Sequence, residues 1–242
     1  MAGSLGVTLN NREFILLAPV GVYDTTTETL LVADTHFGKD ATFRHHSIPV
    51  PAGSNASTIR KIQSMISMYK VSRLIILGDM FHDRTSLSRE TRDQLDPFFA
   101  EHQTIATFLV PGNHDTGISD LPKNWNIHVI EAGPYLDGIT LSHYPITTET
   151  PSPSIPAPSI PENNDSSDHI HTNLCGHLHP AIRIGSAIDQ VKLPCFLLRD
   201  GNLILPAIGE FTGTYTIEPK RSDRIWVVAE DEIIEWFSRG VY

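Results

Sequence analysis

The sequence has few cysteines, no long hydrophobic run and relatively few basic residues. Its 242 residues include only two cysteines, Cys175 and Cys195. Two are too few for a disulfide framework, so we expect partly buried free thiols. No apolar run approaches the ~20 residues that a membrane-spanning helix needs. The N-terminus lacks the basic stretch and apolar core of a signal peptide. We therefore predict a soluble, cytoplasmic protein with no membrane partner.

Acidic residues outnumber basic ones, 28 to 18, and the formal net charge is −10. This balance argues against a general nucleic-acid coat protein, which needs a basic surface. It does not exclude a nuclease, because bound cations and a few local basic side chains can reverse the field at a site. A hydrophobic content of 40% is ordinary for a globular protein. The length suits a single domain over residues 1–242.

The first half of the chain alternates apolar runs with helical patterns. Apolar side chains at helical spacing predict an amphipathic helix over residues 56–70. A weaker helical pattern covers residues 88–102, with Pro97 at or near a break. The predicted strands lie at residues 13–24, 29–36, 73–79 and 104–115. This alternation predicts a parallel sheet with right-handed crossovers.

After Asp115 the chain consists mostly of strand-like runs with few helical signals between them. Residues 199–202 (RDGN) favour a hairpin turn, and a short helix is predicted at residues 231–240. We expect a mainly antiparallel second sheet that packs against the first. Its strands are predicted within residues 125–133, 135–145, 173–185, 193–209 and 224–231.

Residues 148–171 differ in composition from both halves. They carry five prolines with serines between them, and proline at this density excludes helix and central strand. The composition predicts an exposed, polyproline-like loop at about 148–170.

Side chains that suit metal ions follow the ends of five predicted strands. Ligands of open parallel sheets bind beyond the carboxyl ends of the strands, so these ends are expected to converge on one edge. For any one of these strand ends taken alone, a polar surface strand is the alternative interpretation. The occurrence of five such ends favours a metal site. In an extended CGHLHP segment, His177 and His179 would point the same way. The candidates are Asp34, His36, Asp79, Asn113, His114, Asp115, His143, His177 and His179.

The mixture of carboxylate, imidazole and amide groups indicates the class of metal. It suits a divalent ion such as Mn, Fe or Zn, whereas structural zinc in a thiolate site would need more cysteines. Seven ligands, as many as the seven metal-binding residues assigned below, are too many for one such ion that also keeps coordination positions open for water. We therefore predict two divalent metal ions about 3.5–4 Å apart, bridged by one carboxylate.

These motifs, in this order and spacing, resemble those of the calcineurin-like metallophosphoesterases. Residues 32–53, 193–196 and 205–213 are similar to the bacterial DNA ligase-associated branch of that family. The resemblance implies an α/β fold, a four-layer α/β/β/α sandwich with a parallel-rich first sheet and a mainly antiparallel second sheet. The motifs that carry it are Asp34-x-His36, Gly78-Asp79, Gly112-Asn113-His114-Asp115, His143 and Gly176-His177-x-His179.

The resemblance also implies roles, cofactors and partners. It implies hydrolysis of a phosphoester by a hydroxide that two metal ions activate, with Mn expected and Fe or Zn as alternatives. DNA is the implied substrate, and DNA ligase-associated repair proteins are the implied partners. Carried over by motif, the first ion is held by Asp34, His36 and His179, the second by Asn113, His143 and His177, and Asp79 bridges the two.

Two residues beside Asn113 suggest acid catalysis. His114 is not needed as a ligand, so we predict that it is the general acid or a phosphate contact. Asp115 would orient His114 by accepting a hydrogen bond from the other ring nitrogen of His114. The alternative is that Asp115 is only a turn residue before Gly117.

The three glycines before candidate ligands are expected to allow close packing or positive φ, with ordinary turn glycines as the alternative. They are Gly78, Gly112 and Gly176.

The remaining polar residues near the motifs have competing interpretations. Residues 39–46 (KDATFRHH) contain a small basic patch that fits a polyanion, although a solvated loop is more common. Arg84, which follows His82 and Asp83, either clamps a phosphate or forms a surface salt bridge. We expect Cys175 to belong to the core. We expect no ligand role for His102, His128, His169 or His171.

We predict a metal-dependent phosphodiesterase that acts on nucleic acid in DNA repair. The first alternative keeps the chemistry and changes the substrate to a nucleotide or a phosphoprotein. A non-catalytic scaffold on the same fold is disfavoured, because such scaffolds lose ligands and all seven predicted ligand positions are filled here.

Overall fold

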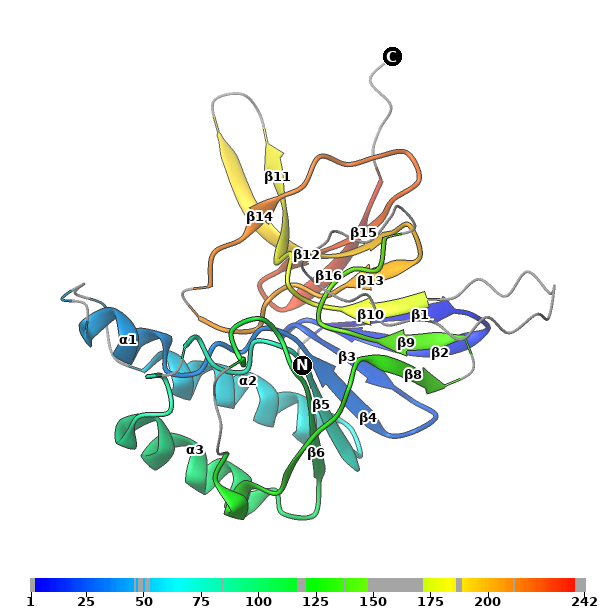
Figure 1. Cartoon of the computed structure of the whole chain (residues 1–242). Coiled ribbons are helices and arrows are strands. Elements are labelled where there is room, and N and C mark those ends of the chain that lie inside the picture. Colours follow the sequence, from blue (N-terminus) through cyan, green and yellow to red (C-terminus); the bar gives the residue numbers. More distant parts are fainter. Residues whose placement is uncertain are drawn as a thin grey trace.

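The computed structural model describes residues 3–45, 47, 50, 53–83, 85–116, 121–136, 138–147, 172–185, 189–210 and 212–237. The predicted proline-rich loop lies outside the described residues, as do His46, Arg84, His169 and His171. Two β-sheets pack against each other, and the α-helices lie on the side of the first sheet (Figure 1). Within the described ranges, no helix is long and apolar enough to cross a membrane.

The first sheet has seven strands in sequence order. Strands β1 to β4 pair antiparallel, and β4 to β7 pair parallel. The parallel part confirms the expectation from the first half of the sequence. Strand β7, expected in the second sheet, instead pairs with β6. The strands are β1 (Ser4–Leu9), β2 (Arg12–Leu17), β3 (Gly21–Asp24), β4 (Thr29–Val32), β5 (Arg73–Leu77), β6 (Ala106–Val110) and β7 (Ile127–Val129).

A turn splits the single strand that was predicted at residues 13–24. Val20 has a φ of 76°, and its backbone N–H donates to the carbonyl of Leu17. The chain therefore reverses between β2 and β3, and the two strands pair antiparallel.

The helices are α1 (Lys39–His45), α2 (Ser54–Met68) and α3 (Arg89–Glu101), with a 3-10 turn η1 (Lys123–Trp125). Helix α3 runs through Pro97, where a break was predicted. Pro97 and Asp93, whose carbonyl loses its helical donor, are both exposed, so water can satisfy that carbonyl. The following pair, Phe98 and Phe99, is buried and anchors the end of the helix in the core.

The second sheet has nine strands, in the order β14-β11-β12-β13-β10-β9-β8, with β15 pairing both β12 and β16. Five of its strand pairs are antiparallel and three are parallel, so the mainly antiparallel sheet is confirmed. The strands are β8 (Gly133–Leu136), β9 (Ile139–Leu141), β10 (Thr172–Cys175), β11 (Pro180–Gly185), β12 (Gln190–Arg199), β13 (Asn202–Ile204), β14 (Tyr215–Thr216), β15 (Arg224–Ala229) and β16 (Glu232–Trp236).

Two short-range predictions in the second half have opposite outcomes. The turn at residues 199–202 is confirmed, because Asp200 and Gly201 have φ values of 49° and 74° between β12 and β13. The helix at residues 231–240 is wrong. Glu230, with a φ of 52°, reverses the chain, and β16 then pairs antiparallel with β15.

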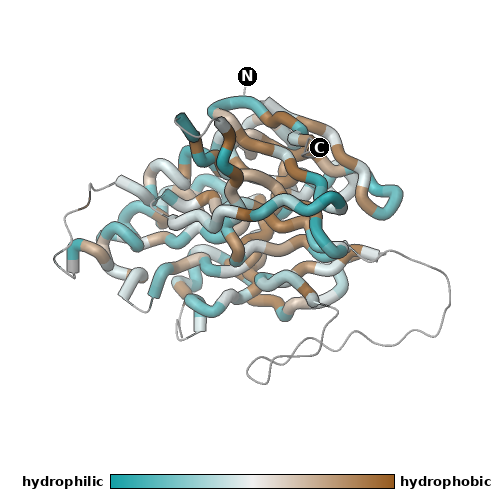
Figure 2. Tube along the Cα trace, turned by 90° about the horizontal axis from the view of Figure 1, so that it is seen from above, coloured by the Kyte–Doolittle hydropathy of each residue, from teal (hydrophilic) through white to brown (hydrophobic). Residues whose placement is uncertain are grey.

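The second sheet buries apolar side chains on both of its faces. Leu174 and Leu203 belong to the main core, together with first-sheet residues, whereas their neighbours Cys175 and Ile204 belong to a smaller cluster. Both cysteines are buried and free. Figure 2 shows hydrophobic residues concentrated in the packed strands and hydrophilic residues mainly at the turns and edges. The α/β sandwich class is confirmed, while the single-domain organisation stays a prediction.

Candidate metal centre

The ends of five strands from the two sheets converge at one edge of the sandwich. Asp34 and Asp79 lie just beyond β4 and β5, and Asn113 lies three residues after β6. His143 and His177 follow β9 and β10 of the second sheet in the same way. Because β4, β5 and β6 are parallel neighbours, their carboxyl ends meet at the same edge.

The first group of side chains comprises Asp34, His36 and His179, whose candidate ligand atoms all lie within 4.8 Å of one another. The Nε2 atom of His179 is 3.3 Å from Oδ1 of Asp34. His179 donates from Nδ1 to the carbonyl of Gly213 at 2.9 Å, which leaves Nε2 directed toward the group. Asp34 is held by its other oxygen, Oδ2, which accepts from the backbone N–H of His177 at 3.0 Å.

The second group comprises Asp79, His143 and His177, again within 4.8 Å. His143 donates from Nδ1 to the carbonyl of Leu77 at 3.1 Å, so Nε2 of the neutral ring carries a lone pair. That atom lies 3.4 Å from Oδ2 of Asp79, 3.1 Å from Nδ1 of His177 and 3.3 Å from Oδ1 of Asn113. Acceptor atoms gathered this closely favour a cation among them.

Asp79 lies between the two groups. Its Oδ2 atom is 3.4 Å from Nε2 of His143 in the second group and 4.0 Å from Nε2 of His36 in the first. Its Oδ1 atom accepts from the backbone N–H of His114 at 2.9 Å. Burial opposes its ionisation, but the adjacent His143 ring and the backbone N–H of His114 outweigh burial and lower the pKa of Asp79 to about 2. A charged carboxylate therefore adjoins both groups, as the predicted bridging role requires.

The first group also fits a metal ion by its unpaired polar atoms. Within the described part of the chain, Oδ1 of Asp34, Nε2 of His179 and both ring nitrogens of His36 are buried without a hydrogen-bond partner. Leaving such an atom unpaired costs about 1–3 kcal/mol, a cost that a bound cation would remove. Burial lowers the pKa of His36 to about 2, so its ring is neutral, the form that binds metals.

Five of the candidate ligands have left-handed backbone conformations, which non-glycine residues seldom adopt and which cost about 1–3 kcal/mol each. The CGHLHP segment is therefore not extended, and the expectation that His177 and His179 point the same way is wrong. The turn instead sends the two rings into different groups. The five φ values are 55° for Asp34, 44° for His36, 48° for Asp79, 68° for His177 and 49° for His179.

The three glycines before candidate ligands are required by close packing. A Cβ atom on Gly78 would overlap the ring of His143, and Gly78 also has a φ of +78°. A Cβ on Gly112 would overlap the carboxylate of Asp79. Gly176 approaches Asp34 in the same way. Ordinary turn glycines, the alternative from the sequence, do not explain these contacts.

We expect Gly78→Ala to destabilise the fold by about 2–4 kcal/mol, because left-handed strain adds to overpacking against His143. Gly53→Ala is the matched control. Gly53 has a φ of +108° but nothing within 4 Å of an added Cβ, so it should lose only about 1–2 kcal/mol, the cost of the left-handed backbone alone. Urea unfolding of both variants measures the difference. Equal losses would show that the overlap at Gly78 is relieved at no cost.

His114 lies at the mouth of the centre, and its side chain is 37% exposed. Its Nε2 atom is 4.0 Å from Oδ2 of Asp79, and its ring stacks on that of His82 with the centroids 5.2 Å apart. This position suits a group that meets a substrate. The general-acid role of His114 stays a prediction.

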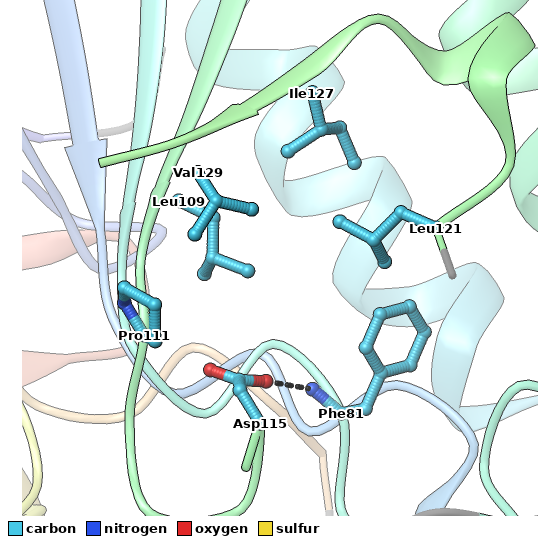
Figure 3. Close-up of a pocket in the computed structure, with 7 residues that line it drawn as sticks. All are labelled: Phe81, Leu109, Pro111, Asp115, Leu121, Ile127 and Val129. Atoms are coloured by element: carbon cyan, nitrogen blue, oxygen red, sulfur yellow. Dashed lines mark hydrogen bonds between the residues drawn. The ribbon is translucent and has the colours of Figure 1, made fainter. Parts of the chain in front are cut away.

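Asp115 does not orient His114 as predicted. Its carboxylate accepts from the backbone N–H groups of Phe81 at 3.2 Å and Gly112 at 2.9 Å, and Figure 3 shows it directed at Phe81 beside Pro111. Burial raises the pKa of Asp115. Asp115 thus ties the loop after β5 to the loop after β6, which is closer to the turn-residue alternative.

Two aromatic side chains at the centre were given no role by the sequence interpretation. Tyr144 donates from its hydroxyl to Oδ1 of Asn113 at 3.3 Å, and its ring centroid is 4.6 Å from that of His177. His82 lies edge-on to His36 at 5.6 Å. Both are sequence neighbours of candidate ligands, which was the available signal.

The lone histidines lie away from the ligand positions, and the arginine of the basic patch is paired within the protein. His102 contacts Phe98 on α3, and His128 contacts Phe108, as expected of structural residues. Arg44 pairs with Asp40 and Glu90, so most of its charge is used within the protein.

The chain belongs to the calcineurin-like phosphoesterase family, whose pattern matches residues 28–155, more than half of the 242 residues. Among solved structures it is similar to Pseudomonas putida nuclease MPE, at 26% identity and a TM-score of 0.76, covering 97% of this chain and 100% of that one. A protein of unknown function from Aquifex aeolicus gives 17% identity, a TM-score of 0.37 and coverage of 62% of this chain and 77% of that one. No curated protein matches. The family and the nuclease neighbour make this chain a phosphoester hydrolase.

Proposed function

We propose that the protein is a phosphodiesterase that cleaves DNA and works with two divalent metal ions, Mn in the first place and Fe or Zn as alternatives. The similar solved structure is that of a nuclease and extends over nearly the whole chain, which supports a nucleic-acid substrate. The resemblance of residues 32–53 and 205–213 to the ligase-associated branch extends the proposal to DNA repair, with repair proteins as partners.

The observation that carries the proposal is the placement of Asp79 between two groups of ligand atoms. Asp34, His36 and His179 would hold one ion, Asn113, His143 and His177 the other, and Asp79 both. Bound there, two cations would lower the pKa of a coordinated water and neutralise charge on the phosphoryl group.

In this proposal the ring of His114, which is partly exposed beside Asp79, would give a proton to the leaving oxygen. The carbonyls of Leu77 and Gly213 fix the proton on Nδ1 of His143 and His179, and so keep their Nε2 atoms free for metal. Asp34 and Asp79 supply the negative charge that two divalent ions require.

We expect removal of metal by a chelator to abolish hydrolysis and added metal ions to restore it. The restored activity should saturate at two ions per chain. The test is a titration of metal-free protein with Mn²⁺, Fe²⁺ or Zn²⁺, followed by metal analysis and by assays on bis-nitrophenyl phosphate, nitrophenyl phosphate and DNA. Full activity at one ion per chain would contradict the two-metal proposal. Preference for the monoester over both diesters would contradict the phosphodiesterase.

A further inference from the structure

The side chain of Lys39 is largely buried beside the metal centre. Lys39 is the first residue of α1, and its residue exposure is 9%. Within the described ranges its side chain makes no hydrogen bond or ion pair. Its ammonium lies 5.8 Å from the centroid of the Phe43 ring. It also interacts electrostatically with Asp79, His36 and His82. An ammonium that is partly desolvated and has no hydrogen-bond or ion-pair partner loses hydration and gains little in return. Its retention therefore indicates an anionic ligand.

The backbone fixes Lys39 next to the first group of ligands. Its N–H donates to the carbonyl of His36 at 3.3 Å. The preceding residue, Gly38, donates to Oδ1 of Asn55 at 2.8 Å, and a Cβ on Gly38 would overlap Ser86. Burial lowers the pKa of Lys39, and the carboxylate of Asp79 opposes this change, in keeping with a position near the centre.

His82 supplies a second unpaired polar group close to Lys39, since both side chains contact the ring of Phe43. Its Nδ1 atom is buried and has no partner among the described residues, although the ring itself is held firmly. It stacks on His114 and meets the rings of His36 and Phe43 edge-on at 5.6 and 5.9 Å. An imidazole nitrogen that is fixed but unpaired can donate to a ligand oxygen.

We propose that Lys39 and His82 bind non-bridging oxygens of the phosphate that reacts at the metal centre. The inference rests on the proposed function, which supplies the phosphoester. Lysine offers only donors, and a phosphate offers only acceptors once ionised, so the two are complementary. Substrate binding would then pair the ammonium that folding leaves unpaired.

The test compares Lys39→Met, which removes the charge at similar length, with Lys39→Arg, which retains it. Lys70→Met is the matched control, because Lys70 is 83% exposed and pairs with Glu28. Thermal unfolding is followed with and without inorganic phosphate, on metal-free and Mn²⁺-loaded protein, and inhibition of bis-nitrophenyl phosphate hydrolysis by phosphate is measured. His82→Phe, which keeps the ring stack, is a second variant.

We expect Lys39→Met to unfold at the wild-type temperature or above, because a partly desolvated charge is removed, and to gain less stability from phosphate. Phosphate affinity and kcat/KM should fall roughly 10- to 100-fold, the effect of one charge-assisted hydrogen bond. Lys39→Arg should lose less, Lys70→Met nothing, and His82→Phe should weaken phosphate binding without losing metal.

A lower unfolding temperature for Lys39→Met with an unchanged phosphate response would overturn the inference and make Lys39 structural. An effect confined to DNA would also overturn it, because the contact would then be to a neighbouring phosphate. If the wild type hydrolyses no diester while Lys39→Met still loses phosphate binding, the proposed function fails and the phosphate site stands.

Discussion

Replacing Asp79 with Asn should reduce hydrolysis by ~10²–10⁴-fold, more than any other single substitution among the candidate ligands. Oδ2 of Asp79 approaches Nε2 atoms of both groups, whereas Asp34 comes near only Nδ1 of His143 in the second group. The loss of Asp79 therefore removes negative charge and disturbs the spacing of two metal sites at once. Removing one partner from a buried charged array costs about 3–5 kcal/mol, which corresponds to this range of rates. The measurement is turnover of a diester together with metal content.

Asp24→Asn is the matched control for this substitution. Asp24 is also fully buried, but it pairs with Arg12 and bonds Thr27 and Tyr135 away from the metal centre. Asp24→Asn should lower the free energy of unfolding while metal content and turnover per folded molecule stay unchanged. If Asp79→Asn keeps near-normal turnover while His36→Ala abolishes it, the bridge is assigned to the wrong residue.

Replacing His114 with Ala should lower the rate by ~10²–10⁴-fold through loss of acid catalysis, while metal binding remains. Metal should stay bound because the bond to Asp79 comes from the backbone N–H of residue 114, which alanine retains. The loss should be large for a DNA phosphodiester and small for nitrophenolate, a leaving group that needs no proton.

The comparison of leaving groups decides what His114 does. An equal loss on DNA and on the nitrophenyl diester would indicate phosphate binding rather than proton transfer. His128→Ala is a suitable control, since His128 is an exposed histidine of β7 in contact with Phe108 and should leave both rates unchanged.

The location of the candidate centre was predictable because its side chains directly follow strands. An apolar run that ends in Asp34 or Asp79 identifies both the strand and the polar end, and parallel pairing brings such ends together. The orientation of His177 and His179 was not predictable in this way. One leucine between two histidines has the spacing of a strand, and the left-handed φ values of both residues depend on contacts with distant Asp34 and Gly213.

The elements that the sequence misassigned have their cause in long-range contacts. Strand β16 contains Ile233, Ile234 and Trp236 at a spacing that also suits a short helix, and pairing with β15 decides in favour of strand. Asp115 follows His114 in sequence, yet its carboxylate is taken by N–H groups of Phe81 and Gly112. Neither competing partner is visible in the local sequence.

The bond between Asp34 and the backbone of His177 joins residues 143 positions apart, which has a consequence for folding. The first sheet is complete at residue 129, before the second sheet has been synthesised. Leu30 lies beside Met65 of α2, so its neighbour Leu31, which is fully buried in the finished fold, points to the opposite face and stays uncovered until the second sheet docks. Contacts that close such long loops form slowly, and uncovered apolar strands aggregate. We therefore expect the metal centre to form last, after the second half of the chain has docked. Refolding yield should depend on protein concentration, and added metal should slow unfolding more than it speeds folding.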